Sequence, residues 1–289
     1  MGERFALSSD SKPFFYPFFI PAKVELLNED FDVLVVVDAD SRVSPNFIDE
    51  IKYQFAQGAH AVQVPYRVGN PEASMRTRLM HIALMAFNIL RPRSRAGFGL
   101  SAGIFGNGFA LSVQTLKKVP YLASSIVEDV EYHLRLIQAG YRVTFVSNTS
   151  VYADMPIAGS GVKTQRTRWE GGRFRLLREL GPQLFKQILT GDFRKIEPLL
   201  DLMLLPLAFH TLLLALVIFI PGFAWYGCFS FAMLTLHILT AIVVSKGRLR
   251  DLSILAVVPF YLLWKITLVP SLFKTARKNA TWIRTERLP

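Results

Sequence analysis

The chain has 289 residues, and 51% of them are hydrophobic, a share that argues against an entirely soluble protein and predicts that part of the chain lies in lipid. A formal net charge of +11 favours a partner that carries phosphate, such as nucleic acid, anionic lipid or a sugar nucleotide. A single cysteine excludes an internal disulfide. The five histidines lack metal-ligand spacing, which predicts ordinary packing or surface roles for them.

The first part of the chain alternates between strand and helix patterns. Residues 31–37 form a short, β-branched and nearly continuous apolar run, which predicts a strand buried on both faces of a parallel sheet. Apolar side chains at every fourth position predict a helix over 46–57, and the next strand is expected at 61–65. This alternation predicts an α/β fold.

The elements that follow are marked by proline, glycine and a capping pattern. Pro71 is expected to open a long helix to about residue 90, followed by a basic turn with three arginines at 91–95. A capping-box pattern at 125–128 predicts a helix that ends at Gly140. A further strand is expected at 141–146.

The C-terminal third is much more apolar. The stretches 202–220, 223–244 and 252–273 are each close to the ~20 residues that cross a bilayer. The basic loop 245–250 is expected on the cytoplasmic side, together with the α/β part. The third stretch contains two prolines and a lysine, so an interfacial or re-entrant segment is the alternative there.

Two aspartates follow the first predicted strand. Asp38 and Asp40 are separated by one residue at its carboxyl end, where open α/β sheets bind ligands. Mg²⁺ and Mn²⁺ are commonly held by one or two carboxylates together with substrate phosphates. The pair therefore predicts a metal–diphosphate site, with an ordinary aspartate turn as the alternative.

Asp129 lies in the first turn of the helix that the capping box predicts. The positive end of the helix dipole favours an ionised carboxylate there, as a general base requires. The alternative is that Asp129 only complements the dipole.

A basic segment places an amide, a guanidinium and an indole at positions i, i+3 and i+4, which share one face if the segment is helical. These residues are Gln165, Arg168 and Trp169. Arg168 could neutralise a departing diphosphate, and Trp169 could stack on a sugar ring. The alternative is a basic helix beside the membrane that binds anionic lipid.

The glycine-rich segment 97–108 lacks the spacing of a dinucleotide-binding loop. Gly106, Asn107 and Gly108 could bring backbone close to a ligand at the acceptor site, or could form a tight turn before a strand.

The order of these motifs resembles that of the membrane-bound family 2 glycosyltransferases, which include cellulose, chitin and hyaluronan synthases. That order is Asp-x-Asp, Gly-Asn-Gly, Glu-Asp, Gln-x-x-Arg-Trp and then apolar helices. The similarity covers nearly the whole chain, including residues 31–45, 99–111, 127–146 and 282–287. It implies a partial GT-A domain, of α/β class, followed by C-terminal transmembrane helices.

The resemblance also implies roles for the residues. Mg²⁺ or Mn²⁺ would be held by Asp40 with help from Asp38, and Asp129 would be the catalytic base of an inverting transfer. The donor would be a nucleotide sugar and the acceptor a polysaccharide or lipid-linked glycan, without nucleic acid. The residues implied around the acceptor and the leaving diphosphate are Gln165, Arg168 and Trp169.

The expected organisation is a GT-A domain at 1–180, an amphipathic interfacial linker at 181–200, a transmembrane region at 201–273 and a basic cytoplasmic tail at 274–289. This organisation predicts an integral membrane protein of the bacterial inner membrane or an equivalent membrane. Family members place a first strand and an acidic, nucleotide-contacting residue well upstream of Asp-x-Asp, whereas 37 residues precede Asp38 here. This predicts a truncated chain, with a separate polypeptide as the possible source of the missing half. The remaining hypotheses are a non-catalytic fragment, or half of a split enzyme, and a membrane protein that recognises anionic lipid.

Overall fold

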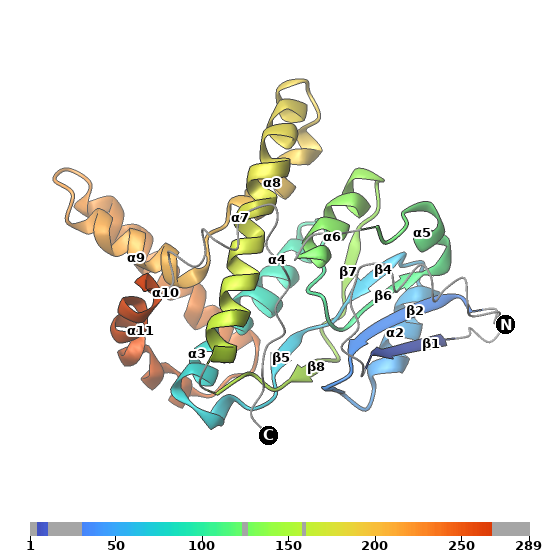
Figure 1. Cartoon of the computed structure of the whole chain (residues 1–289), viewed down its shortest axis with the longest axis horizontal. Coiled ribbons are helices and arrows are strands. Elements are labelled where there is room, and N and C mark those ends of the chain that lie inside the picture. Colours follow the sequence, from blue (N-terminus) through green and yellow to red (C-terminus); the bar gives the residue numbers. More distant parts are fainter. Residues whose placement is uncertain (1–4, 11–30, 123–126, 158–159, 268–289) are drawn as a thin grey trace. The chain divides into compact units, whose positions relative to one another are not determined.

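A computed structural model describes residues 5–10, 31–122, 127–157 and 160–267 (Figure 1). The chain forms two compact units. The first comprises residues 1–73, 80–124 and 128–155, and the second comprises residues 74–79, 125–127 and 156–289. The domain boundary expected at residue 180 falls inside the long helix α7 (Ser160–Leu189), whereas the units separate between residues 155 and 156.

The first unit is built on a five-stranded sheet with the order β1-β2-β6-β4-β7. Its strands are β1 (Phe5–Asp10), β2 (Val33–Asp38), β4 (Ala61–Gln63), β6 (Phe109–Ser112) and β7 (Val143–Phe145). β1 pairs in parallel with β2, and β4 with β7, but β6 is antiparallel to both β2 and β4. The α/β expectation is confirmed, and the expectation of a purely parallel sheet is wrong. An apolar run indicates burial on both faces but carries no information about the direction of the neighbouring strands.

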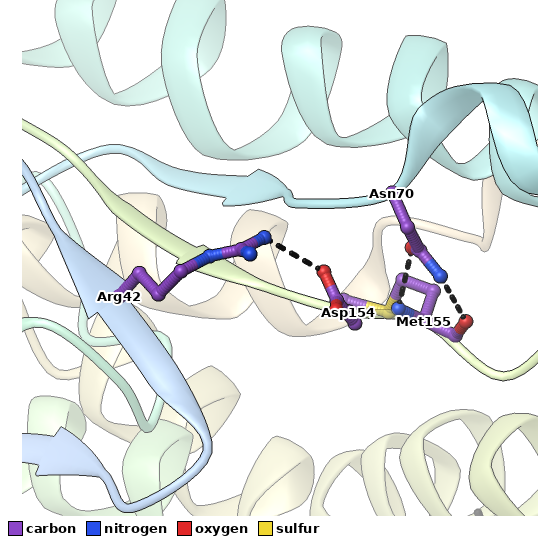
Figure 2. Close-up of polar contacts among 4 residues, drawn as sticks. All are labelled: Arg42, Asn70, Asp154 and Met155. Carbon is purple, nitrogen blue, oxygen red and sulfur yellow. Dashed lines mark hydrogen bonds and ion pairs between the residues drawn. The ribbon is translucent and has the colours of Figure 1, made fainter. Parts of the chain in front are cut away.

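Three short strands form a second sheet in the order β3-β8-β5, and none of them was expected. They are β3 (Ser41–Val43), β5 (Tyr66–Val68) and β8 (Val151–Ala153). Figure 2 shows the contacts at the end of β8. The Asn70 side chain donates to the Met155 carbonyl at 2.9 Å and accepts from the Met155 N–H at 2.8 Å, while Arg42 pairs with Asp154 at 3.0 Å. The Arg42–Asp154 ion pair is exposed and contributes little to stability. The two bonds of Asn70 therefore help to fix this end of β8.

Two helices agree with the sequence pattern. α2 (Phe47–Ala56) buries Phe47 and Ile51, as the spacing of its apolar residues predicts. α6 (Glu128–Gln138) stops before Gly140, which has a φ of +84° and so adopts the left-handed conformation that ends many helices.

The basic turn expected at 91–95 is wrong, because the chain remains helical there. A short turn, η1 (Pro71–Ala73), leads into α3 (Met75–Leu84), a π-helical segment η2 (Met85–Leu90) and α4 (Arg91–Gly97). Pro92 lies in the first turn of α4, directly after the π-helical segment, and its fixed φ is compatible with a helix, so the proline does not end the helical run here.

The core of the first unit lies on the sheet beneath α6 and α5 (Val113–Lys118). Strand residues such as Leu34, Phe109 and Leu111 pack there with Tyr132 and Leu136 of α6, and all five are less than 5% exposed. This burial holds the start of α6 against the sheet.

Gly108 occupies a place where no side chain fits. Its φ is +70°, and a Cβ there would lie 2.6 Å from Val151 Cγ1 and 2.9 Å from Val64 Cγ2. We expect Gly108→Ala to lower the free energy of unfolding by about 3 kcal/mol, from backbone strain and overpacking together. The matched control is Gly58→Ala, because Gly58 has a similar φ of +86° and open space around it. Unfolding in detergent should show the larger loss for Gly108→Ala, and equal losses would contradict the steric argument.

The second unit is helical throughout its described part. α7 is followed by η3 (Phe193–Lys195), α8 (Ile196–Met203), α9 (Leu207–Ile218) and α10 (Ala224–Val244). The segments η4 (Leu249–Val257) and α11 (Val258–Ile266) come last. Figure 1 shows α9 and α10 as a hairpin, in which the backbone of α10 approaches α9 closely. A Cβ on Gly227 would lie 2.8 Å from the backbone nitrogen of Ile218, so only glycine allows this approach.

Among the described helices, α10 alone is long and apolar enough to cross a membrane. Only 22% of its most apolar 18-residue window is buried, unlike the core helix of a soluble protein. The stretch expected to cross at 202–220 is not one straight helix, because the segment Phe193–Met203 and α9 meet at an angle of 85°, and a crossing there remains a prediction. The expected third stretch contains η4 and α11, and its end and the basic tail lie outside the described residues.

Candidate functional site

The two aspartates of the Asp-x-Asp motif lie where the sequence places them, at the end of a strand. Asp38 is the last residue of β2, and Asp40 lies in the turn between β2 and β3. Both side chains are on the exposed side of the sheet edge. This position leaves the carboxylates accessible to a ligand.

A single buried amide connects both sides of that turn. Asn107 Oδ1 accepts from the Asp38 N–H at 3.1 Å, and Asn107 Nδ2 donates to Ser41 Oγ at 2.8 Å. Asn107 is 1% exposed, so the two bonds form out of competition with water. The Asn107 side chain therefore sets the shape of the turn that carries Asp40.

The neighbouring residue, Gly106, faces Asp129. A Cβ on Gly106 would lie 3.4 Å from Asp129 Oδ2, and the φ of Gly106 is +76°. The other carboxylate oxygen, Asp129 Oδ1, accepts from the Val130 N–H at 2.8 Å in the first turn of α6. One oxygen of Asp129 thus satisfies the helix start while the other faces the glycine segment.

The structure therefore brings three of the predicted groups together, namely the Asp38 turn, the segment 106–108 and Asp129. The Gly-Asn-Gly segment links them, because its asparagine bonds to the backbone N–H of Asp38 and its first glycine faces the Asp129 carboxylate. Residues 106–108 form a bend that leads directly into β6, which begins at Phe109.

Two residues that take part in this arrangement were not expected. Ser41 accepts the bond from Asn107, and Gln63 is buried completely beneath the glycine segment. The side-chain oxygen of Gln63, Oε1, accepts from the Phe105 N–H at 3.0 Å. Its amide nitrogen donates to the carbonyls of Asn107 and Gly108 at 2.8 and 3.0 Å. In the sequence, this role of Gln63 is indicated only by its being the one polar residue among the apolar residues of a buried strand.

A pair of buried tyrosines lies on the inner side of Asp129. The rings of Tyr121 and Tyr132 are 4.5 Å apart, and the Tyr132 hydroxyl donates to the Val119 carbonyl at 2.8 Å. Burial raises the pKa of Tyr121 far above its usual value, and the nearby carboxylates of Glu128 and Asp129 raise it further. Tyr121 therefore stays neutral beside the acidic helix start.

Gln165, Arg168 and Trp169 all lie in α7, so the helical condition for a shared face is met. They belong to the second unit. Their grouping with Asp38 and Asp129 remains a prediction.

The donor groups fit a metal that arrives with a phosphate ligand. In the described part of the chain, no three His, Cys, Asp or Glu residues are grouped so as to hold a metal ion. Asp38 and Asp40 supply two carboxylates at an exposed strand end, which is the number that Mg²⁺ commonly takes from a protein when substrate phosphates complete its shell.

Two of the histidines have the packing roles that their spacing suggests. His133 is buried, and its Nε2 lies 2.8 Å from Ser101 Oγ. His60 places its ring against the ring of Tyr141.

Comparison with known proteins connects this geometry to a family. The family model described as "Glycosyl transferase family group 2" matches residues 33–268. Glucomannan 4-beta-mannosyltransferase 7 of Arabidopsis thaliana is 21% identical over 288 residues, which cover 89% of this chain and 48% of the relative. The probable glycosyltransferase YdaM of Bacillus subtilis (strain 168) is 26% identical over 162 residues, which cover 54% of this chain and 38% of YdaM.

A second plant protein, probable glucomannan 4-beta-mannosyltransferase 14 of Arabidopsis thaliana, is 20% identical over 168 residues. That alignment covers 57% of this chain and 31% of the relative. The chain spans about half the length, or less, of these relatives.

Proposed function

This chain belongs to glycosyl transferase family group 2, and we propose that it moves a sugar from a nucleotide-sugar donor to a polysaccharide or lipid-linked acceptor at a membrane, with inversion. One observation carries the proposal. The segment 106–108 contacts the Asp38 turn on one side and Asp129 on the other, so that two groups with different chemical tasks share one site.

The proposed division of labour follows from the position of each group. An acceptor hydroxyl attacks the anomeric carbon from the face opposite the nucleotide, and Asp129 removes its proton. Asp38 and Asp40 would hold Mg²⁺ or Mn²⁺, whose positive charge would stabilise the leaving diphosphate. Arg168 adds a second positive charge, and Gln165 and Trp169 orient the acceptor.

The names of the relatives suggest which sugars to test first. Two of them are named for glucomannan and mannosyl transfer, so mannose and glucose donors have priority. A nucleic acid substrate has no part in the proposal.

We place the transfer at a membrane because the second unit contains the apolar helix α10 and many exposed apolar side chains. Around the turn between α9 and α10, three aromatic side chains are more than half exposed: Phe219, Phe223 and Trp225. Such aromatic side chains are typical of the membrane–water boundary. We propose that the first unit faces the cytoplasm, where nucleotide sugars are available.

Removal of the metal tests the proposal directly. The full chain in lipid nanodiscs is incubated with radiolabelled nucleoside-diphosphate sugars and Mn²⁺. We expect a chelator to abolish transfer and excess Mn²⁺ to restore it. Asp40→Asn should lower the rate by about 10²-fold or more, because one of two charged ligands is lost.

The matched control for that variant is Asp49→Asn, since Asp49 is an exposed aspartate in the first turn of α2. Its rate should equal that of the unmodified chain. Transfer that needs no metal, or that survives in Asp40→Asn, would contradict the proposed role of the aspartates. Salt-sensitive liposome binding without transfer would favour the lipid-recognition hypothesis instead.

A further inference from the structure

We propose that Gln63 is a positioning residue, which sets the distance between the Asp38–Asp40 turn and Asp129 by holding the segment 105–108 between them. The inference rests on the proposed function, because it assigns Gln63 to the same reaction. It adds a residue whose side-chain bonds go to the backbone of residues 64, 105, 107 and 108, so that it acts on the acidic groups through Asn107 and Gly106.

The bonding capacity of the Gln63 side chain is directed almost entirely at this one segment. The carbonyl oxygen accepts from the Phe105 N–H, and the amide nitrogen donates to the Asn107 and Gly108 carbonyls. A third contact of that nitrogen, at 2.9 Å, is with the carbonyl of the adjacent Val64. A buried amide with both ends occupied has a single orientation, so it also fixes the peptide groups that it contacts.

Those peptide groups belong to the residues that contact the acidic groups. The backbone of Asn107 is held by Gln63, and the side chain of Asn107 bonds to the Asp38 N–H and to Ser41. Gly106 lies between the two residues that Gln63 holds, and it faces Asp129 Oδ2. Displacement of the segment therefore moves the two sides of the site relative to each other.

The surrounding sheet explains why the segment needs this support. Gly106 and Gly108 both have positive φ angles, so residues 105–108 do not follow regular strand geometry. Backbone bonds hold Gly108 at both of its polar groups, from Gly108 N to Val36 O and from Val64 N to Gly108 O. The Phe105 N–H and the Asn107 carbonyl, in contrast, bond to the Gln63 side chain. A change at Gln63 therefore releases the part of the segment that faces Asp129.

Two substitutions separate shape from hydrogen bonding. Gln63→Met keeps the length of the side chain but removes every bond, leaving an N–H and carbonyls of the segment buried without this partner. Gln63→Glu keeps an acceptor for the Phe105 N–H but sets a carboxylate against the Asn107 and Gly108 carbonyls. Both should displace the segment.

The kinetic experiment uses the full chain in nanodiscs with Mn²⁺ and the best donor. We expect kcat to fall about 10–100-fold in both variants, since a displacement of about 1 Å in a reacting geometry has an effect of this order. We also expect the Mn²⁺ concentration for half-maximal rate to rise at least threefold, because the Asp38 turn loses its fixed shape. A loss of folded protein alone would lower the rate without changing that concentration.

The matched control is Ser101→Ala. Ser101 is buried in the same unit and bonds to His133 and to the Val143 N–H, so its loss weakens the fold without touching the site. This variant should show lower thermal stability with unchanged kcat and Mn²⁺ dependence. If Gln63→Met and Gln63→Glu behave like Ser101→Ala, the positioning role is overturned.

A second measurement does not depend on activity. Hydrogen–deuterium exchange should become faster in peptides that contain residues 36–41 and 104–109 when Gln63 is changed to Met, and should not change there in Ser101→Ala. If exchange becomes faster in Gln63→Met but the unmodified chain shows no sugar transfer, the mechanical coupling is supported and the proposed function is rejected. Unchanged exchange would overturn the inference even if the chain is an active transferase.

Discussion

Asp129→Asn is expected to lower sugar transfer by about 10²–10⁴-fold, the range associated with loss of a general base. Asparagine has the same size and can still accept the bond from the Val130 N–H through its oxygen, so the start of α6 should remain intact. It cannot take a proton from the acceptor hydroxyl. Donor binding should therefore persist while turnover is lost.

Initial rates and equilibrium binding of a radiolabelled donor, measured on the same nanodisc preparation, test this result. Glu131→Gln is the control, because Glu131 lies in the same helical turn but pairs with Arg135 at 2.7 Å. Loss of this ion pair in Glu131→Gln should lower the free energy of unfolding by only about 0.3–0.5 kcal/mol and leave transfer unchanged. Retained turnover in Asp129→Asn would remove Asp129 from the catalytic role, whatever happens to the control.

The places of Asp38 and Asp129 in the fold were predictable from the sequence, whereas the connections between them were not. A strand that ends at Asp38 and a helix that begins at Glu128, next to Asp129, follow from local patterns of apolar residues, while the capping box expected at 125–128 lies partly outside the described residues. The bond from the Asp38 N–H to Asn107 joins residues 69 positions apart, and no local pattern encodes such a distance. Gln63 was missed for the same reason, since its partners in the segment 105–108 lie more than 40 residues away in the sequence.

The fold shows the same division between local and long-range information. Helices with regular apolar spacing, such as α2 and α6, begin and end close to their expected limits. The three-residue strands of the second sheet are too short to show a period, and their pairing depends on residues 41–43 and 66–68 both meeting 151–153. Strand direction in the main sheet is likewise a property of the pairing and not of one strand's composition.

In the second unit, the apolar run from residue 202 concealed a break. Pro206 restricts the residue before it to extended conformations and lies just before the first residue of α9. Hydropathy averaged over a window weighs the leucines on both sides of the break equally, so it does not reveal that the segment Phe193–Met203 and α9 meet at 85°. The proline was the informative residue.

Lys265→Met is expected to lower the free energy of unfolding by about 3–5 kcal/mol, the cost of leaving a buried charge without its partner. The Lys265 ammonium contacts the Glu170 carboxylate, and the two side chains are 2% and 7% exposed. The ammonium also lies 5.2 Å from the centre of the Phe209 ring. Through this one residue, α11 contacts both α7 and α9.

A double-mutant cycle separates the charge from the packing. Glu170→Leu with Lys265→Met replaces both charges by apolar groups of similar size, and it should recover most of the stability that Lys265→Met loses. The control, Arg175→Met, breaks a partly exposed pair with Glu179 on α7 and should cost less than about 1 kcal/mol. Unfolding of the detergent-solubilised chain measures all four variants, the fourth being Glu170→Leu alone.

The outcome of this cycle also bears on the site, because Glu170 directly follows Trp169 in α7. If the double variant is stable yet transfers sugar poorly, then the ion pair orients the part of α7 that carries Trp169, beyond holding the helices together. If it is stable and fully active, apolar packing among α7, α9 and α11 is sufficient. A double variant no more stable than Lys265→Met would mean that the cost comes from lost packing, and that the buried pair does not form in the folded chain.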